Sequence, residues 1–166
     1  MALQPERDVV SWLTERAESL AVAESLTGGQ VAAQIVSVPG ASAVLRGAVV
    51  AYQKSVKAHV LGVDPDVLER EGAVSEAVVR QMAEGVRHCL DGGAVATWGL
   101  ATTGVAGPDP DPDTGALPGE VWIAVAGPSG THAVHLALTG DREEIRRQAS
   151  SQALDTLRDS IARSGE

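Results

Sequence analysis

The stretch from Ala21 to Gln30 carries the first side chain that could do chemistry, the hydroxyl of Ser25. An apolar run precedes this serine and a Gly-Gly pair follows it, which is typical of a buried strand that ends in a tight turn before a helix. At such a turn a serine is either a nucleophile beside backbone N–H groups that stabilise an oxyanion, or the N-cap of the helix. The residues of this stretch leave both roles open.

A neutral lysine is the base that the sequence offers to this serine. Lys54 and Lys57 are the only lysines among 13 basic residues, and both follow the only tyrosine, Tyr52. Burial can make a lysine neutral near pH 7, whereas an arginine stays charged. We therefore expect Lys57 to be the base, with Lys54 helping to keep it neutral by charge repulsion and Tyr52 supporting the pair. The alternatives are two solvated lysines and a tyrosine that anchors apolar neighbours.

The histidines and the cysteine form no catalytic or metal-binding pattern. No cluster of His, Cys and carboxylate residues has the spacing of a metal site, and Cys89 has no second cysteine to pair with. No G-x-x-x-x-G-K-[ST] sequence is present, which excludes a P-loop nucleotidase. Four histidines occupy positions poorly suited to a catalytic triad: His59, His88, His132 and His135. We expect neither a metal nor a cofactor.

Arg142 is the candidate for binding an anion. It falls in the first turn of the last predicted helix, where a positive charge opposes the helix dipole. An anionic ligand would explain that placement, and a solvated charge is the alternative. Asp141 is the expected N-cap of the same helix.

The elements that must position these side chains alternate between helix and strand and end in a hairpin and a long helix. Periodicity predicts helices over residues 5–18, 30–36, 55–61, 64–70, 75–90 and 141–163, and strands over 20–24, 47–52, 94–102, 121–126 and 132–138. The run at 47–52 is continuously apolar, which predicts a strand buried on both faces. This order favours a single α/β domain with a mixed sheet covered by helices on both faces.

Three loops follow predicted strands at residues 25–29, 52–57 and 102–108. If the three strands are parallel, their carboxyl ends share one edge of the sheet, which is where open α/β sheets bind ligands. Ser25, Lys57 and Thr103 would then meet in one crevice.

Composition excludes several classes of protein. The chain has 166 residues, which predicts one domain over 1–166, and its net charge of −9 gives no basic face for nucleic acid. No apolar run approaches the roughly 20 residues that span a bilayer. A single cysteine suits a reducing compartment. We expect a cytoplasmic domain with no nucleic-acid or membrane partner, and the oligomeric state stays open.

Five sequence motifs together resemble the CinA C-terminal-domain family. They are Ala23-Glu24-Ser25-Leu26-Thr27-Gly28-Gly29, Tyr52 with Lys57 and Leu61-Gly62-Val63, Gly72-Ala73-Val74-Ser75-Glu76, Thr103-Gly104-Val105-Ala106-Gly107-Pro108, and Gly140-Asp141-Arg142. The resemblance covers residues 10–157. Its stand-alone members are nicotinamide mononucleotide deamidases, also called nicotinamide-nucleotide amidases.

This resemblance implies a three-layer α/β/α sandwich that hydrolyses nicotinamide mononucleotide to nicotinate mononucleotide and ammonia, without metal or cofactor. By the same resemblance Ser25 is the nucleophile, Lys57 its general base and Tyr52 a supporting hydrogen-bond partner. Thr103 and Gly104 line the site, and Arg142 binds the phosphate or orients the substrate. Backbone N–H groups of the turn hold the oxyanion, at Thr27, Gly28 and Gly29.

One segment departs from the family pattern. Where the family usually has Lys-Pro-Val-Gly-Thr-Val, this chain has Ala116-Leu117-Pro118-Gly119-Glu120-Val121. A lysine is missing and a glutamate is gained near the place expected for an anionic substrate. Two alternatives therefore stand beside the deamidase. One is a non-catalytic nucleotide-binding or regulatory module linked to competence or DNA damage, and the other is an amidase for another small amide.

Overall fold

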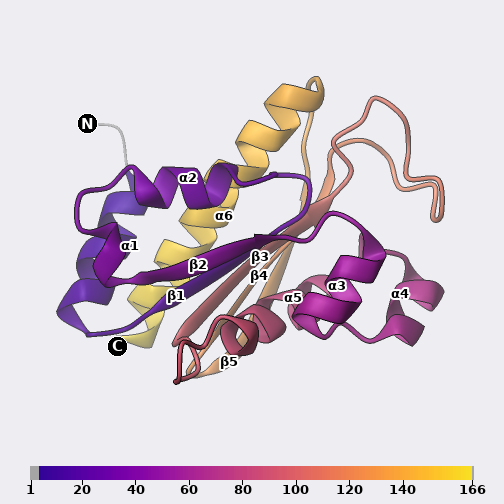
Figure 1. Cartoon of the computed structure of the whole chain (residues 1–166). Coiled ribbons are helices and arrows are strands. Elements are labelled where there is room, and N and C mark those ends of the chain that lie inside the picture. The colour runs from indigo at the N-terminus through magenta and orange to yellow at the C-terminus, as the bar shows by residue number, and fades with distance from the viewer. Residues whose placement is uncertain (1–3, 166) are drawn as a thin grey trace.

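A computed structural model describes residues 4–165, and its centre is a five-stranded mixed sheet (Figure 1). The strand order is β2-β1-β3-β4-β5. The first three strands run parallel, and β4 and β5 form an antiparallel hairpin beside β3. The strands are β1 (Leu20–Glu24), β2 (Leu45–Val50), β3 (Trp98–Gly104), β4 (Glu120–Gly127) and β5 (Gly130–Ala137). The predicted mixed sheet and its parallel strands are confirmed.

Helices cover both faces of the sheet, which confirms the three-layer sandwich (Figure 1). One apolar cluster packs α1 (Pro5–Glu15), α2 (Gln30–Val36) and α6 (Arg142–Ser164) on one face. A second cluster packs α3 (Lys54–Leu61), α4 (Pro65–Glu71) and α5 (Glu76–Cys89) on the other. A short 3-10 helix, η1 (Ala41–Ala43), precedes β2. Because successive strand side chains point to opposite faces, Val22 of β1 joins the first cluster and Ala21 and Ala23 join the second.

The backbones of α3 and α5 pack closely against each other. Gly85 of α5 lies under the carbonyl of Leu61 at the end of α3, and a Cβ built on this glycine would stand 1.7 Å from that oxygen. Only a residue without a side chain fits there. This contact matters for the site because α3 carries Lys57.

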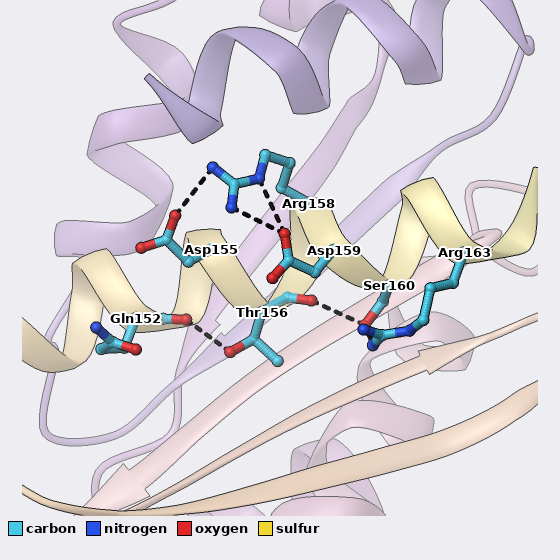
Figure 2. A network of polar contacts seen from close by, with 7 residues as sticks. All are labelled: Gln152, Asp155, Thr156, Arg158, Asp159, Ser160 and Arg163. Carbon is cyan, nitrogen blue, oxygen red and sulfur yellow. Dashed lines mark hydrogen bonds and ion pairs between the residues drawn. The ribbon is translucent and has the colours of Figure 1, made fainter. Parts of the chain in front are cut away.

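Polar side chains along the C-terminal half of α6 contact one another (Figure 2). Arg158 pairs with Asp155 at 3.2 Å and with Asp159 at 2.8 Å, and these carboxylates raise the pKa of its guanidinium. The hydroxyl of Thr156 donates to the carbonyl of Gln152 at 2.7 Å, one turn earlier in the helix. Asp141 caps the other end of α6 in a capping box with Glu144, which confirms the predicted N-cap.

Three predicted elements differ from the structure in burial or bounds. The strand expected over 47–52 is β2 at the edge of the sheet, with alternating exposure, so the prediction of a strand buried on both faces is wrong. An apolar run cannot reveal that its sheet ends there. The strand expected from residue 94 begins only at Trp98, and the helix expected to residue 18 ends at Glu15, before Ala17 takes a positive φ of 53°.

Candidate active site

Ser25 and Lys57 meet at the carboxyl edge of the parallel strands. Ser25 directly follows β1, and Lys57 lies in the first turns of α3, which follows β2. The Lys57 Nζ donates to the Ser25 Oγ at 2.9 Å. Both residues are buried, with 7% of Ser25 and 1% of Lys57 exposed. The structure thus brings the predicted nucleophile and the predicted base into direct contact.

The surroundings of Lys57 favour its neutral form. Burial lowers the pKa of its ammonium from 10.5 to about 8. Its other hydrogen bonds go to the backbone carbonyls of Ala51 at 2.7 Å and Tyr52 at 3.0 Å, and none of its three partners is a carboxylate. A neutral amine has two hydrogens and one lone pair. When the carbonyls accept the two hydrogens, the lone pair faces the Ser25 hydroxyl, as a general base requires.

Glu24, and not Ser25, caps the helix that follows the turn. Its side chain is fully buried, and its carboxylate oxygens accept from the N–H groups of Val31 and Ala32, both at 3.0 Å. A carboxylate at a helix N-terminus satisfies unpaired N–H groups and the helix dipole together. The capping role that the sequence left open for Ser25 is therefore filled by its neighbour, and the serine hydroxyl stays available to Lys57. The sequence feature that indicates this capping role is a glutamate at the end of an otherwise apolar strand.

The turn after Ser25 is bonded to β3 and leaves three N–H groups without an acceptor among the described residues, those of Leu26, Thr27 and Gly29, of which Leu26 and Thr27 are buried. The Ser25 N–H donates to the Thr102 carbonyl at 3.1 Å, and the Gly28 N–H donates back to the Ser25 carbonyl at 3.1 Å. The N–H groups of Leu26 and Thr27 donate to no acceptor among residues 4–165. Buried N–H groups without an acceptor are rare in folded proteins. The first N–H groups of a turn that leads into a helix point back toward the start of the turn. They are the donors that an oxyanion at Ser25 could use.

An open cleft of about 460 Å³ lies over the Ser25–Lys57 pair. Its walls come from the loops after β1, β2 and β3, together with the start of α6. Of the predicted site residues, the cleft is lined by Ser25, Tyr52, Lys57, Thr103, Gly104 and Arg142. Leu26, Asp109 and Asp111 also line it, and the sequence analysis did not single them out. Leu26 lies within the first motif, and the two aspartates directly follow the motif that ends at Pro108.

Three predicted binding residues lie behind the cleft and not on its wall. The Thr27 side chain is fully buried and its Oγ1 lies 2.8 Å from the Thr102 Oγ1. Gly28 and Gly29 take positive φ angles of 60° and 103° and are not part of the lining. These residues shape the turn. The Gly28 N–H is bonded to the Ser25 carbonyl, so its expected role as an oxyanion donor is wrong, and only the N–H groups of Thr27 and Gly29 are left for a substrate.

Tyr52 and Arg142 form the rim of the cleft. The Tyr52 hydroxyl accepts from the Arg142 guanidinium at 3.1 Å, and 59% of Tyr52 is exposed, so it is no apolar anchor. Its contribution to Lys57 is the backbone carbonyl and not the phenol. Arg142 also donates to the Gly107 carbonyl at 2.5 Å. The arginine at the start of α6 is thus held by two neighbours and faces the cleft, where an anion could reach it.

Two charged residues lie elsewhere than expected. Lys54 forms an ion pair with Asp113, which raises the lysine pKa, and burial alone lowers the pKa of Lys57. The expected repulsion between the two lysines is therefore wrong. Glu120 faces His135 of β5 at 3.5 Å and does not line the cleft. None of residues 116–121, where the chain departs from the family pattern, lines the cleft.

Within residues 4–165, no group of three or more His, Cys, Asp or Glu side chains is arranged to hold a metal ion. No helix among the described residues is long and apolar enough to cross a membrane.

The fold and the site define a three-layer α/β domain with a buried serine–lysine pair at the carboxyl edge of its parallel strands. The CinA C-terminal domain model matches residues 3–161, and the chain belongs to this family.

Relatives and solved structures agree with this assignment. A CinA-like protein from Anaeromyxobacter sp. (strain K) is 51% identical over 154 residues, which cover 90% of this chain and 36% of that protein. A CinA-like protein from Frankia casuarinae is 49% identical over 154 residues, covering 93% and 34%. The chain therefore spans about a third of the length of these curated relatives. The crystal structure of a competence-damaged protein (CinA) superfamily protein from Klebsiella pneumoniae 700603 matches with a TM-score of 0.89 at 32% identity, over 96% of this chain and 97% of that one.

Proposed function

We propose that the chain is an amidase that hydrolyses the carboxamide of nicotinamide mononucleotide to nicotinate mononucleotide and ammonia. The observation that carries this proposal is the contact of 2.9 Å between the Ser25 Oγ and a buried lysine amine that has no carboxylate partner among residues 4–165. A serine beside a base of lowered pKa is the arrangement of nucleophilic acyl transfer. The family resemblance supplies the substrate.

In the first half of the reaction, the Ser25 Oγ attacks the carboxamide carbon while the neutral Lys57 amine accepts the hydroxyl proton. The carbonyl oxygen becomes an oxyanion, which the N–H groups of Leu26 and Thr27 stabilise. Lys57 then gives its proton to the amide nitrogen as the C–N bond breaks. Ammonia leaves, and an ester joins Ser25 to the nicotinoyl group.

In the second half, Lys57 accepts a proton from water as the water oxygen attacks the ester carbonyl. The tetrahedral intermediate collapses, the bond to the Ser25 Oγ breaks, and Lys57 returns the proton to that oxygen. Nicotinate mononucleotide leaves with its new carboxylate. The phosphate lies toward Arg142, because a guanidinium binds phosphate through directed, charge-assisted hydrogen bonds.

The test measures ammonia release from nicotinamide mononucleotide by the wild type, Ser25→Ala and the matched pair Lys57→Arg and Lys54→Arg. We expect turnover by the wild type, loss of turnover in Ser25→Ala, and loss in Lys57→Arg, because arginine keeps the charge but cannot act as a base. Lys54→Arg, three residues away, keeps a cation for Asp113 and should stay active. Thermal unfolding shows whether each variant folds, and Lys57→Met serves if arginine does not fit.

Other outcomes would support the alternative functions. Nucleotide binding by the wild type without ammonia release would favour a non-catalytic module. Release from other small carboxamides, but not from nicotinamide mononucleotide, would retain the amidase and replace its substrate. Full activity of Ser25→Ala would remove this serine from the mechanism.

A further inference from the structure

A second arginine of α6, Arg146, forms hydrogen bonds to the turn that carries the proposed nucleophile, Ser25. Its Nε donates to the Leu26 carbonyl at 2.8 Å and its Nη2 to the Thr27 carbonyl at 3.3 Å. Both hydrogen bonds that this guanidinium makes within residues 4–165 go to the carbonyls of the two residues after Ser25. The contact joins segments about 120 residues apart, and Arg146 lies outside the cleft lining.

These two bonds fix the direction of the N–H groups on the same peptides. A trans peptide unit is planar, so its carbonyl and its N–H point in opposite directions. The Leu26 carbonyl points at Arg146, and the Thr27 N–H of the same peptide therefore points away from α6. This N–H is one of the two buried donors of the turn that have no acceptor among the described residues. The next peptide is set in the same way, because the Thr27 carbonyl faces Arg146 while the Gly28 N–H reaches the Ser25 carbonyl.

A glycine in the turn leaves space for the Arg146 guanidinium. Gly28 has a φ of 60°, and a Cβ built on it would lie 3.1 Å from the Arg146 Nη2. A side chain at this position would crowd the guanidinium as well as strain the backbone. On the other side of the turn, the Glu24 carboxylate fixes the start of α2. The Arg146 guanidinium thus binds the carbonyls of the turn, and the Glu24 carboxylate binds the N-terminus of α2, which follows the turn.

We propose that Arg146 is a positioning residue for catalysis, which orients the Thr27 N–H toward the oxyanion formed at Ser25. The inference rests on the proposed acyl transfer at Ser25. A flat guanidinium suits the task because it reaches two adjacent carbonyls with donors in a fixed fork, whereas an ammonium is a single point of charge. Arg146 touches no reacting atom, and its effect passes through the two peptide planes.

The first experiment measures kcat and KM for nicotinamide mononucleotide in Arg146→Met, Arg146→Lys and the control Arg147→Met. Arg147 is the next residue of the same helix and is exposed. Since an oxyanion donor acts mainly in the transition state, we expect kcat to fall about 10- to 100-fold in Arg146→Met with KM within about twofold. Arg146→Lys should recover part of the loss, and Arg147→Met should equal the wild type. The pH midpoint of kcat/KM should not move, because Lys57 keeps its surroundings.

A second readout does not depend on the amide substrate. An alkyl fluorophosphonate reacts when the Ser25 Oγ bonds to phosphorus, fluoride leaves, the hydroxyl proton passes to Lys57, and the phosphoryl oxygen occupies the oxyanion position. Intact-protein mass measures the rate of this labelling. We expect Arg146→Met to be labelled about tenfold or more slowly than the wild type and Arg147→Met. Ser25→Ala should not be labelled.

The outcomes separate this inference from the proposed function. Slower labelling of Arg146→Met in a protein that releases no ammonia from nicotinamide mononucleotide would support Arg146 and reject only the substrate. Equal labelling and equal kcat in Arg146→Met and the wild type would reject the positioning role alone. A wild type that neither releases ammonia nor becomes labelled would reject both. A loss of activity in Arg146→Met that follows a lower unfolding temperature, with KM and the pH midpoint changed, would assign Arg146 to structure alone.

Discussion

The pH dependence of turnover tests the role of Lys57 most directly. The perturbation is a change of pH from 7 to 10, which titrates an amine whose pKa burial has lowered to about 8. In the proposed mechanism the neutral amine is the active form, so kcat/KM should follow its fraction. With this pKa, about one-eleventh of Lys57 is neutral at pH 7 and about ten-elevenths at pH 9. We therefore expect kcat/KM to rise about tenfold between these values and then to level off.

A lysine of ordinary pKa would behave differently. With a pKa of 10.5, the neutral fraction would rise about a hundredfold between pH 7 and pH 9 and would keep rising to pH 10. Titration of the substrate phosphate should contribute little to the change in kcat/KM between pH 7 and pH 9, because its second pKa is about 6. The assay follows formation of nicotinate mononucleotide by chromatography at low substrate concentration, where the rate reports the free enzyme.

Two results would refute this reasoning. A rate that does not change between pH 7 and pH 9 would show that Lys57 is not a base that titrates in this range. A rate that climbs without a plateau to pH 10 would show that burial does not lower the pKa as the structure indicates. Lys54→Arg is the control, and its midpoint should match that of the wild type, because this residue pairs with Asp113 and not with Lys57.

Four further predictions concern stability and binding. Between pH 7 and pH 10, the unfolding free energy of the wild type should rise by about 2 to 3 kcal/mol relative to that of Lys57→Met. The reason is that Lys57 binds a proton more tightly in the unfolded chain than when it is buried. An equal change in unfolding free energy for both proteins, measured in urea, would contradict this. Glu24→Gln should lose about 1 to 2 kcal/mol in urea unfolding, because an amide cannot accept from both N–H groups of α2, and an unchanged midpoint would remove its capping role. Gly85→Ala should lose about 1 to 3 kcal/mol, since its Cβ would meet the Leu61 carbonyl, and a normal unfolding temperature would show that α3 can shift. Arg142→Met should lower kcat/KM for nicotinamide mononucleotide about tenfold and leave nicotinamide riboside, which lacks the phosphate, unaffected; equal losses on both would place the arginine elsewhere.

Local sequence determined the pieces that carry the site. The predicted bounds of β1 and α2, 20–24 and 30–36, match the structure, because a short apolar run and a glycine pair fix a strand, a turn and a helix within a few residues. The Asp141 cap follows from the same local rules. The motif resemblance also identified Ser25 and Lys57 as a pair.

Tertiary structure alone decided how those pieces act. Lys57 lies 32 residues from Ser25, and its burial, its three hydrogen-bond partners and its lowered pKa all arise from packing between α3 and the ends of β1 and β2. Glu24 became the cap of α2, which left the serine hydroxyl to the lysine. Arg146 reaches the turn from the far end of the chain. Sequence spacing describes neighbours along the chain, whereas the surroundings of an ionisable group depend on which distant segments exclude water from it.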